Sequence, residues 1–138
     1  MTDRVLVDTG PIVAILSSDD PHHASCSGEL RKHKQPWITC WPVLTEAAWL
    51  LRKESSGVQR LFELVEKGVI EVVDLDAKAP DWVAKFLKRY ASVKAQVADA
   101  ALMYLAEQRG LESILTLDRR DFSVYRTTAG KGLHVLPE

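Results

Sequence analysis

Short apolar segments alternate with longer amphipathic segments along the whole chain. Runs typical of buried strands lie at residues 4–7, 37–39, 69–73 and 113–117, with a weaker run at 133–136. Between them, the spacing of apolar residues predicts helices at about 12–16, 21–33, 41–51, 58–66, 80–90 and 93–108. Gly68 and Gly110 follow two predicted helix ends. This alternation predicts an α/β domain with a largely parallel sheet of four to five strands.

Composition narrows the class of protein. The 138 residues contain no repeat and no dividing linker, which predicts a single domain over residues 1–138. Cys26 and Cys40 are too few for a disulfide scaffold or a zinc site, so we expect free thiols. No secretion signal or segment of roughly 20 apolar residues is present, so we expect a cytoplasmic protein without membrane contact. A net charge of −1 argues against holding nucleic acid by bulk positive charge, although bound divalent cations change that field locally.

Two predicted strands end on an aspartate. Asp8 follows the first strand and Asp118 follows the fourth. The carboxyl edge of an open α/β sheet is where ligands bind. An aspartate there also caps the following helix, and for either residue alone this role is as good an interpretation. Two such edges in one small sheet favour a functional site.

Two further acids lie where helical spacing predicts an apolar face. The apolar neighbours are Val43, Trp49 and Leu50 for Glu46, and Ala95, Leu102 and Met103 for Asp99. Carboxylates rarely point into such surfaces without a partner. We expect Trp49 to be packed, and a salt bridge to a base from elsewhere in the chain stays open as the alternative for each acid.

Convergence of these four acids would favour a metal site. Two carboxylates about 4 Å apart repel by roughly 4 kcal/mol at an effective dielectric constant of 20. Oxygen ligands without histidine or cysteine suit Mg²⁺ or Mn²⁺, and such ions activate water and bind phosphate oxygens. Phosphodiester hydrolysis is the chemistry that this pattern predicts.

Four segments resemble the motifs of the PIN domain family, in order and over nearly the whole chain. They are Val-Leu-Val-Asp-Thr-Gly-Pro-Ile from Val5, Leu-Thr-Glu-Ala around Glu46, Val-Ala-Asp-Ala-Ala-Leu around Asp99, and Leu-Thr-Leu-Asp-Arg-Arg-Asp-Phe from Leu115. They are most similar to the VapC-type toxins of toxin–antitoxin pairs. The resemblance implies a three-layer α/β/α sandwich and a metal-dependent endoribonuclease. It also implies a homodimer that is inhibited by a cognate antitoxin protein.

The resemblance also implies roles for individual residues. Asp8, Glu46, Asp99 and Asp118 match the acidic positions, and Thr9 and Thr116 match supporting hydroxyl positions. Asp121 is a fifth acid, which we expect to support the metal ligands rather than to be one. Arg119 and Arg120 adjoin Asp118 and are the bases expected to contact RNA phosphates.

Other functions are compatible with the same sequence pattern. The same site could act in RNA processing or on structured DNA without a toxin role. A phosphoacceptor receiver domain has a similar size and alternation, but it requires an acidic pair after its first strand, where this chain has Asp8 alone. A non-catalytic binding module is the remaining alternative.

Overall fold

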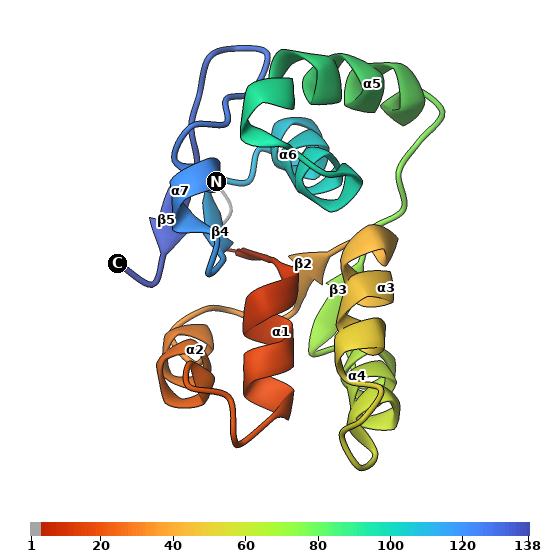
Figure 1. Cartoon of the computed structure of the whole chain (residues 1–138), viewed down its shortest axis with the longest axis vertical. Helices are drawn as coiled ribbons and strands as arrows, with labels where there is room; N and C mark the ends of the chain where they lie inside the picture. Colours follow the sequence, from red (N-terminus) through yellow and green to blue (C-terminus); the bar gives the residue numbers. More distant parts are fainter. Residues whose placement is uncertain (1–3) are drawn as a thin grey trace.

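A five-stranded parallel sheet forms the centre of the molecule over residues 4–138, which the computed structural model describes (Figure 1). Its order is β3-β2-β1-β4-β5, and each neighbouring pair is parallel. The strands are β1 (Leu6–Val7), β2 (Trp37–Thr39), β3 (Ile70–Val72), β4 (Ser113–Leu115) and β5 (His134–Leu136). The expectation of a largely parallel sheet is confirmed, and the weak last run forms the edge strand β5. This order differs from the 2-1-3-4-5 order of receiver domains, which removes that alternative.

Helices cover both faces of the sheet. They are α1 (Thr9–Leu16), α2 (His23–Leu30), α3 (Trp41–Leu50), α4 (Gly57–Glu66), α5 (Ala79–Arg89), α6 (Val97–Arg109) and the short α7 (Arg119–Phe122). The chain moves from β1 to β2 to β3 in one direction across the sheet and then returns to β4. Because parallel crossovers are right-handed, this reversal puts α5 and α6 on the face opposite α1 and α2, as Figure 1 shows. The expected three-layer sandwich is confirmed.

The central strand is wholly buried. Val5, Leu6 and Val7 are at most 1% exposed, and Leu6 pairs with Ile38 on one side and Ile114 on the other. A short strand that is held on both sides and covered on both faces fixes the residue that follows it, which is Asp8.

Element boundaries differ from the prediction where backbone conformation intervenes. The helix expected at 93–108 begins at Val97, because Ala91–Val93 form a 3₁₀ turn and Lys94 then adopts a left-handed conformation with φ 58°. The helix expected at 21–33 is confined to His23–Leu30, and α7 was not predicted. Gly110 ends α6 with φ 65°, as expected for a glycine after a helix.

Two remaining expectations concern thiols and membranes. Cys26 and Cys40 are free, as predicted, and both are buried. Over residues 4–138, none of the helices has both the length and the apolar character required to span a bilayer.

Candidate active site

The site forms where the strand order reverses. β1 and β4 are neighbours, yet their onward connections run to opposite faces of the sheet. Such a reversal opens a crevice beyond the carboxyl ends of the two strands, and ligands of α/β proteins bind there. Asp8 directly follows β1, and its backbone N–H donates to the Leu115 carbonyl of β4 at 2.9 Å. The main chains at the two strand ends are therefore joined at the floor of the crevice.

Asp8 is buried and both of its carboxylate oxygens accept hydrogen bonds. Oδ1 accepts from the Thr9 backbone N–H at 2.8 Å, which caps α1, and Oδ2 accepts from the Thr116 hydroxyl at 2.8 Å. The Thr116 oxygen in turn accepts from the Asp118 backbone N–H at 2.9 Å. Thr116 therefore holds Asp8 and the Asp118 backbone in one hydrogen-bonded chain.

Asp99 is positioned by the start of α6 and by an aromatic hydroxyl. Its Oδ2 accepts from the Gln96 backbone N–H at 3.1 Å, and the Gln96 side chain accepts from the Asp99 backbone in a reciprocal capping box. The Tyr125 hydroxyl donates to the same oxygen at 3.0 Å. The carboxylate is thus held at the pocket, in the first turn of a helix whose next residues, 100–106, are buried.

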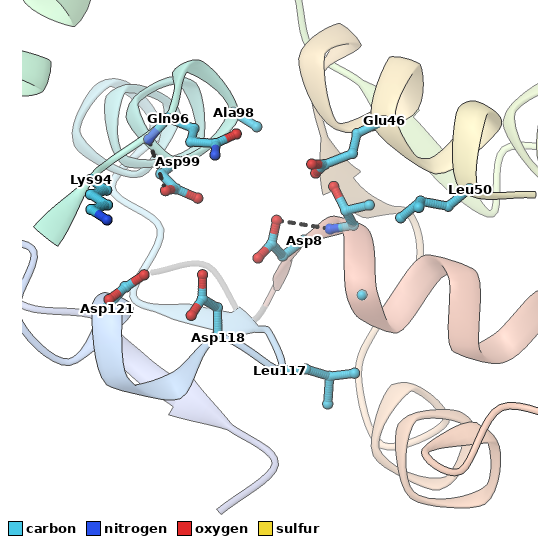
Figure 2. Close-up of a pocket in the computed structure, with 12 residues that line it drawn as sticks. Asp8, Glu46, Leu50, Lys94, Gln96, Ala98, Asp99, Leu117, Asp118 and Asp121 are labelled. Atoms are coloured by element: carbon cyan, nitrogen blue, oxygen red, sulfur yellow. Dashed lines mark hydrogen bonds between the residues drawn. The ribbon is translucent and has the colours of Figure 1, made fainter.

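A single pocket of about 420 Å³ brings five carboxylates together, as Figure 2 shows. Asp8, Glu46, Asp99, Asp118 and Asp121 all line it. They come from the end of β1, from α3, from α6, and from the segment that leads from β4 into α7. None of the five forms an ion pair with a base among residues 4–138.

Burial, and to a smaller extent the uncompensated charges, raises the pKa of several of these carboxyl groups. Burial raises the pKa of Asp8 to about 6, and the charges of Asp99 and Glu46 add to this. Burial also raises the pKa values of Asp99 and Asp118, and in both cases the charge of Asp121 contributes. Loss of solvation and repulsion between like charges both raise these pKa values, as is typical of sites that bind a positive charge.

The donor atoms suit a hard divalent cation. Every ionisable acid that lines the pocket is a carboxylate, and no histidine or cysteine lines it within the described residues. The Thr9 hydroxyl is buried and finds no hydrogen-bond partner among residues 4–138, although Thr9 also lines the pocket. An orphaned hydroxyl beside several carboxylates fits a site that receives an ion with its water ligands.

The carboxylates do not form a closed ligand cage as they lie. Across residues 4–138, no three side chains of histidine, cysteine, aspartate or glutamate are close enough together to hold a metal ion. Mutual repulsion favours such separation when positive charge is missing. The structure therefore gathers the predicted acids around one pocket, but no three of them among residues 4–138 lie close enough together to hold an ion.

A comparison with known protein families identifies the family of this chain. The model of the PIN domain family matches residues 5–127, which include all five acids. The chain belongs to the PIN domain family.

Two mycobacterial proteins are similar to this PIN domain. Ribonuclease VapC26 of Mycobacterium tuberculosis is 27% identical over 135 residues, which cover 96% of this chain and 100% of that protein. The crystal structure of Mycobacterium tuberculosis VapC20, a toxin that cleaves the sarcin–ricin loop, superposes with a TM-score of 0.73. That match covers 80% of this chain and 86% of VapC20 at 17% identity, so it shows a common fold.

One sequence expectation about the PIN site was wrong. Trp49 was expected to be packed, yet it is 63% exposed, and Leu50 is 52% exposed. The core-facing residues of α3 are Val43, Leu44 and Ala47, so the buried stripe is rotated away from Glu46. Glu46 is consequently exposed at the rim of the pocket rather than embedded in an apolar face.

Of the remaining predicted residues, some line the pocket and others lie outside it. Thr9 and Asp121 line the pocket, and Thr116 lies behind Asp8. Arg119 and Arg120 do not line it, and the Arg119 guanidinium donates to the Pro137 carbonyl. Their contact with RNA phosphates stays a prediction.

Sequence reasoning missed two contributors to the PIN site. Tyr125 donates to Asp99 from a loop 26 residues further along the chain, and no spacing rule reveals such a contact. Lys94 lines the pocket but is not among the site residues predicted from the sequence. The signal available for Lys94 was its place in the segment just before α6, which carries Asp99 in its first turn.

Proposed function

We propose that this PIN domain is a Mg²⁺- or Mn²⁺-dependent endoribonuclease that hydrolyses RNA phosphodiester bonds. The observation that carries the proposal is the pocket at the carboxyl edge of the sheet, which is lined by five carboxylates. None of them is compensated by an ion pair within the described part of the chain. Such a pocket repels a nucleic acid unless a divalent cation is bound in it. The similarity to Ribonuclease VapC26 over 96% of the chain supports RNA as the substrate.

The acids fit the role of metal ligands by their chemistry. Asp8, Glu46, Asp99 and Asp118 would hold the ion, with Asp121 in support. When bound, a divalent ion makes a water molecule a better nucleophile and stabilises the developing charge on the leaving oxygen.

The chain's own residues orient the site. Thr116 fixes one oxygen of Asp8 and the backbone of Asp118, so the two strand-end acids keep a constant relative position. Tyr125 and Gln96 fix one oxygen of Asp99 and leave its other oxygen without an intramolecular hydrogen bond among the described residues. These hydrogen bonds hold the carboxylates in place, which reduces the reorganisation needed when substrate binds.

The biological role that we propose is that of a toxin in a VapBC-type toxin–antitoxin pair. The similarity to VapC26 and the fold shared with VapC20 support this role. The proposal includes a cognate antitoxin protein as partner, a homodimer as the active form and the cytoplasm as the location of the RNA that is cut. Co-expression with the product of the adjacent reading frame tests the partner, because a cognate antitoxin should co-purify and suppress cleavage.

A cleavage assay tests the activity. Purified protein is incubated with total bacterial RNA and with single- and double-stranded DNA, in Mn²⁺, in Mg²⁺ and in chelator. We expect RNA cleavage with either metal, none in chelator and none of DNA. The Asp99→Asn variant should lose cleavage, whereas Asp74→Asn, an exposed aspartate outside the pocket, should keep it. Cleavage that persists in chelator, or in Asp99→Asn at the parental rate, would contradict the proposal, and cleavage of DNA alone would change the substrate.

A further inference from the structure

Lys94 carries a positive charge in a pocket that is otherwise acidic. Among the described residues that line the pocket, it is the sole base, and it shares the pocket with five carboxylates. In Figure 2 its side chain lies on the same side of the pocket as Asp99 and Asp121.

The ammonium group of Lys94 is not engaged by those acids. Among residues 4–138 its side chain makes no ion pair within 4.0 Å and no hydrogen bond. A lysine whose role was to neutralise a neighbouring carboxylate would be expected to contact one. The charge is therefore available to an anion that enters the pocket.

The backbone at Lys94 supports a role for its side chain. Lys94 has φ 58°, and Ser56, with φ 59°, is the other residue besides glycine with positive φ in the described chain. This left-handed conformation is unfavourable for a residue with a Cβ atom. Lys94 ends the 3₁₀ turn just before α6, and this conformation places its side chain in the pocket. A glycine would adopt the same backbone with less strain but would supply no charge.

We propose that Lys94 binds the RNA phosphate in the pocket, with its ammonium group contacting a non-bridging phosphate oxygen. This inference rests on the proposed function and adds a substrate-binding residue to it. A phosphodiester that approaches the carboxylates meets repulsion, and a lysine ammonium acts as a mobile point charge that offsets it. The sequence expectation gave this task to Arg119 and Arg120, neither of which lines the pocket.

The first experiment compares Lys94→Met and Lys94→Arg with Lys53→Met, which removes an exposed lysine outside the pocket. The probe is a fluorescein-labelled, mixed-sequence single-stranded RNA of 20 nucleotides. Binding is followed by anisotropy in Ca²⁺, with the intactness of the RNA checked on a gel, and cleavage is followed in Mn²⁺. We expect Lys94→Met to weaken binding about tenfold and to lower kcat/KM about 100-fold. The slope of log K against log salt concentration should become shallower by about 0.7, which is the change expected when one phosphate contact is lost. Lys94→Arg should retain most of both activities.

A second pair of variants separates function from folding. Lys94→Gly and Ser56→Gly change the two strained positions in the same way, and we expect neither to lower Tm. Lys94→Gly should lose RNA binding and cleavage as Lys94→Met does, while Ser56→Gly should keep both. The proposal is overturned if the Lys94 variants bind and cleave like their controls, or if binding weakens with an unchanged salt slope. If the parental protein cuts no RNA, the proposed function fails, and the slope in Ca²⁺ still decides whether Lys94 contacts phosphate.

Discussion

At the scale of single residues, the site depends on carboxylates whose charged form is disfavoured by their burial in the fold. Asp8 is only 8% exposed, and its pKa is raised to about 6 mainly because burial disfavours its charge. Its hydrogen bonds to Thr9 and Thr116 lower the pKa but do not compensate fully for burial. A charged Asp8 therefore reduces the stability of the metal-free fold and favours the binding of a cation.

The first prediction concerns Asp8→Asn in chelator. Folding raises the pKa of Asp8 above its unfolded value of 3.8. The cost of its charge to folding therefore grows as pH rises from about 4 and is complete above about pH 6. We expect Asp8→Asn to be more stable than the parent at pH 7.5 by up to about 3 kcal/mol. The gain should shrink as pH falls from 6 to 4, because Asp8 then takes up a proton and becomes neutral in the folded parent as well.

Urea unfolding from pH 4 to pH 8 measures this difference. Asp74→Asn, which is exposed and outside the pocket, is the matched control and should show no such pH-dependent gain. A variant that is less stable than the parent at pH 7.5 would show that the hydrogen bonds of Asp8 outweigh its desolvation. Cleavage should be lost in Asp8→Asn at every pH.

At the scale of elements, helix ends place the site residues. α6 begins with the capping box that orients Asp99 and ends at Gly110 in a left-handed conformation. Residues 100–106 between these ends are buried, so the helix is fixed along its length. The position of Asp99 relative to the sheet therefore depends on the packing and on both ends of one helix.

The second prediction uses the same substitution at two glycines with different backbones. Gly110 has φ 65°, whereas Gly28 lies inside α2, and a Cβ atom at either position would meet nothing within 4 Å. Gly110→Ala should therefore destabilise the fold by about 1 kcal/mol through backbone strain alone. Gly28→Ala should stabilise it by up to about 1 kcal/mol, because alanine favours the helix.

Thermal or urea unfolding of the two variants tests this sign difference. Both variants should cleave RNA like the parent at temperatures well below their unfolding transitions, since neither glycine lines the pocket. A Gly110→Ala variant as stable as the parent would contradict the left-handed helix end.

At the scale of the whole molecule, the order of strands creates the pocket. Because β1 lies between β2 and β4, acids from positions 8, 46, 99, 118 and 121 meet at one edge of the sheet. The net charge of the chain is only −1, so the negative field is local to this pocket. A divalent cation would relieve that local repulsion, and its binding should be visible in the stability of the entire fold.

The third prediction is that Mg²⁺ or Mn²⁺ raises Tm. An ion at 100 times its dissociation constant stabilises the folded state by about 2.7 kcal/mol, which corresponds to a rise of roughly 5–10 °C for a chain of this size. Asp99→Asn should lose most of this rise and Asp74→Asn should keep it. Superimposable melting curves in millimolar metal and in chelator would contradict metal binding at these acids.

The sequence alone determined the elements and the identity of the acids. Alternating apolar runs are a local property, so they predicted the strands and most helices, and the ordered motifs around Asp8, Glu46, Asp99 and Asp118 indicated the family. The sequence could not predict which side of α3 is buried. Val43, Trp49 and Leu50 share one helical face by their spacing, but spacing does not tell whether another element covers that face. The packing of α3 against the rest of the fold decided that Glu46 and Trp49 are exposed.

Only the tertiary structure decided which side chains meet. The hydrogen bond between Tyr125 and Asp99, the link from Thr116 to Asp8 across 108 residues, and the position of Lys94 in the pocket all depend on strand order and on one left-handed residue. Periodicity reports which face of an element is apolar, but it carries no information on which elements become neighbours. Contacts between residues far apart in the chain arise from the packing of the whole domain, and there the acids acquire their raised pKa values.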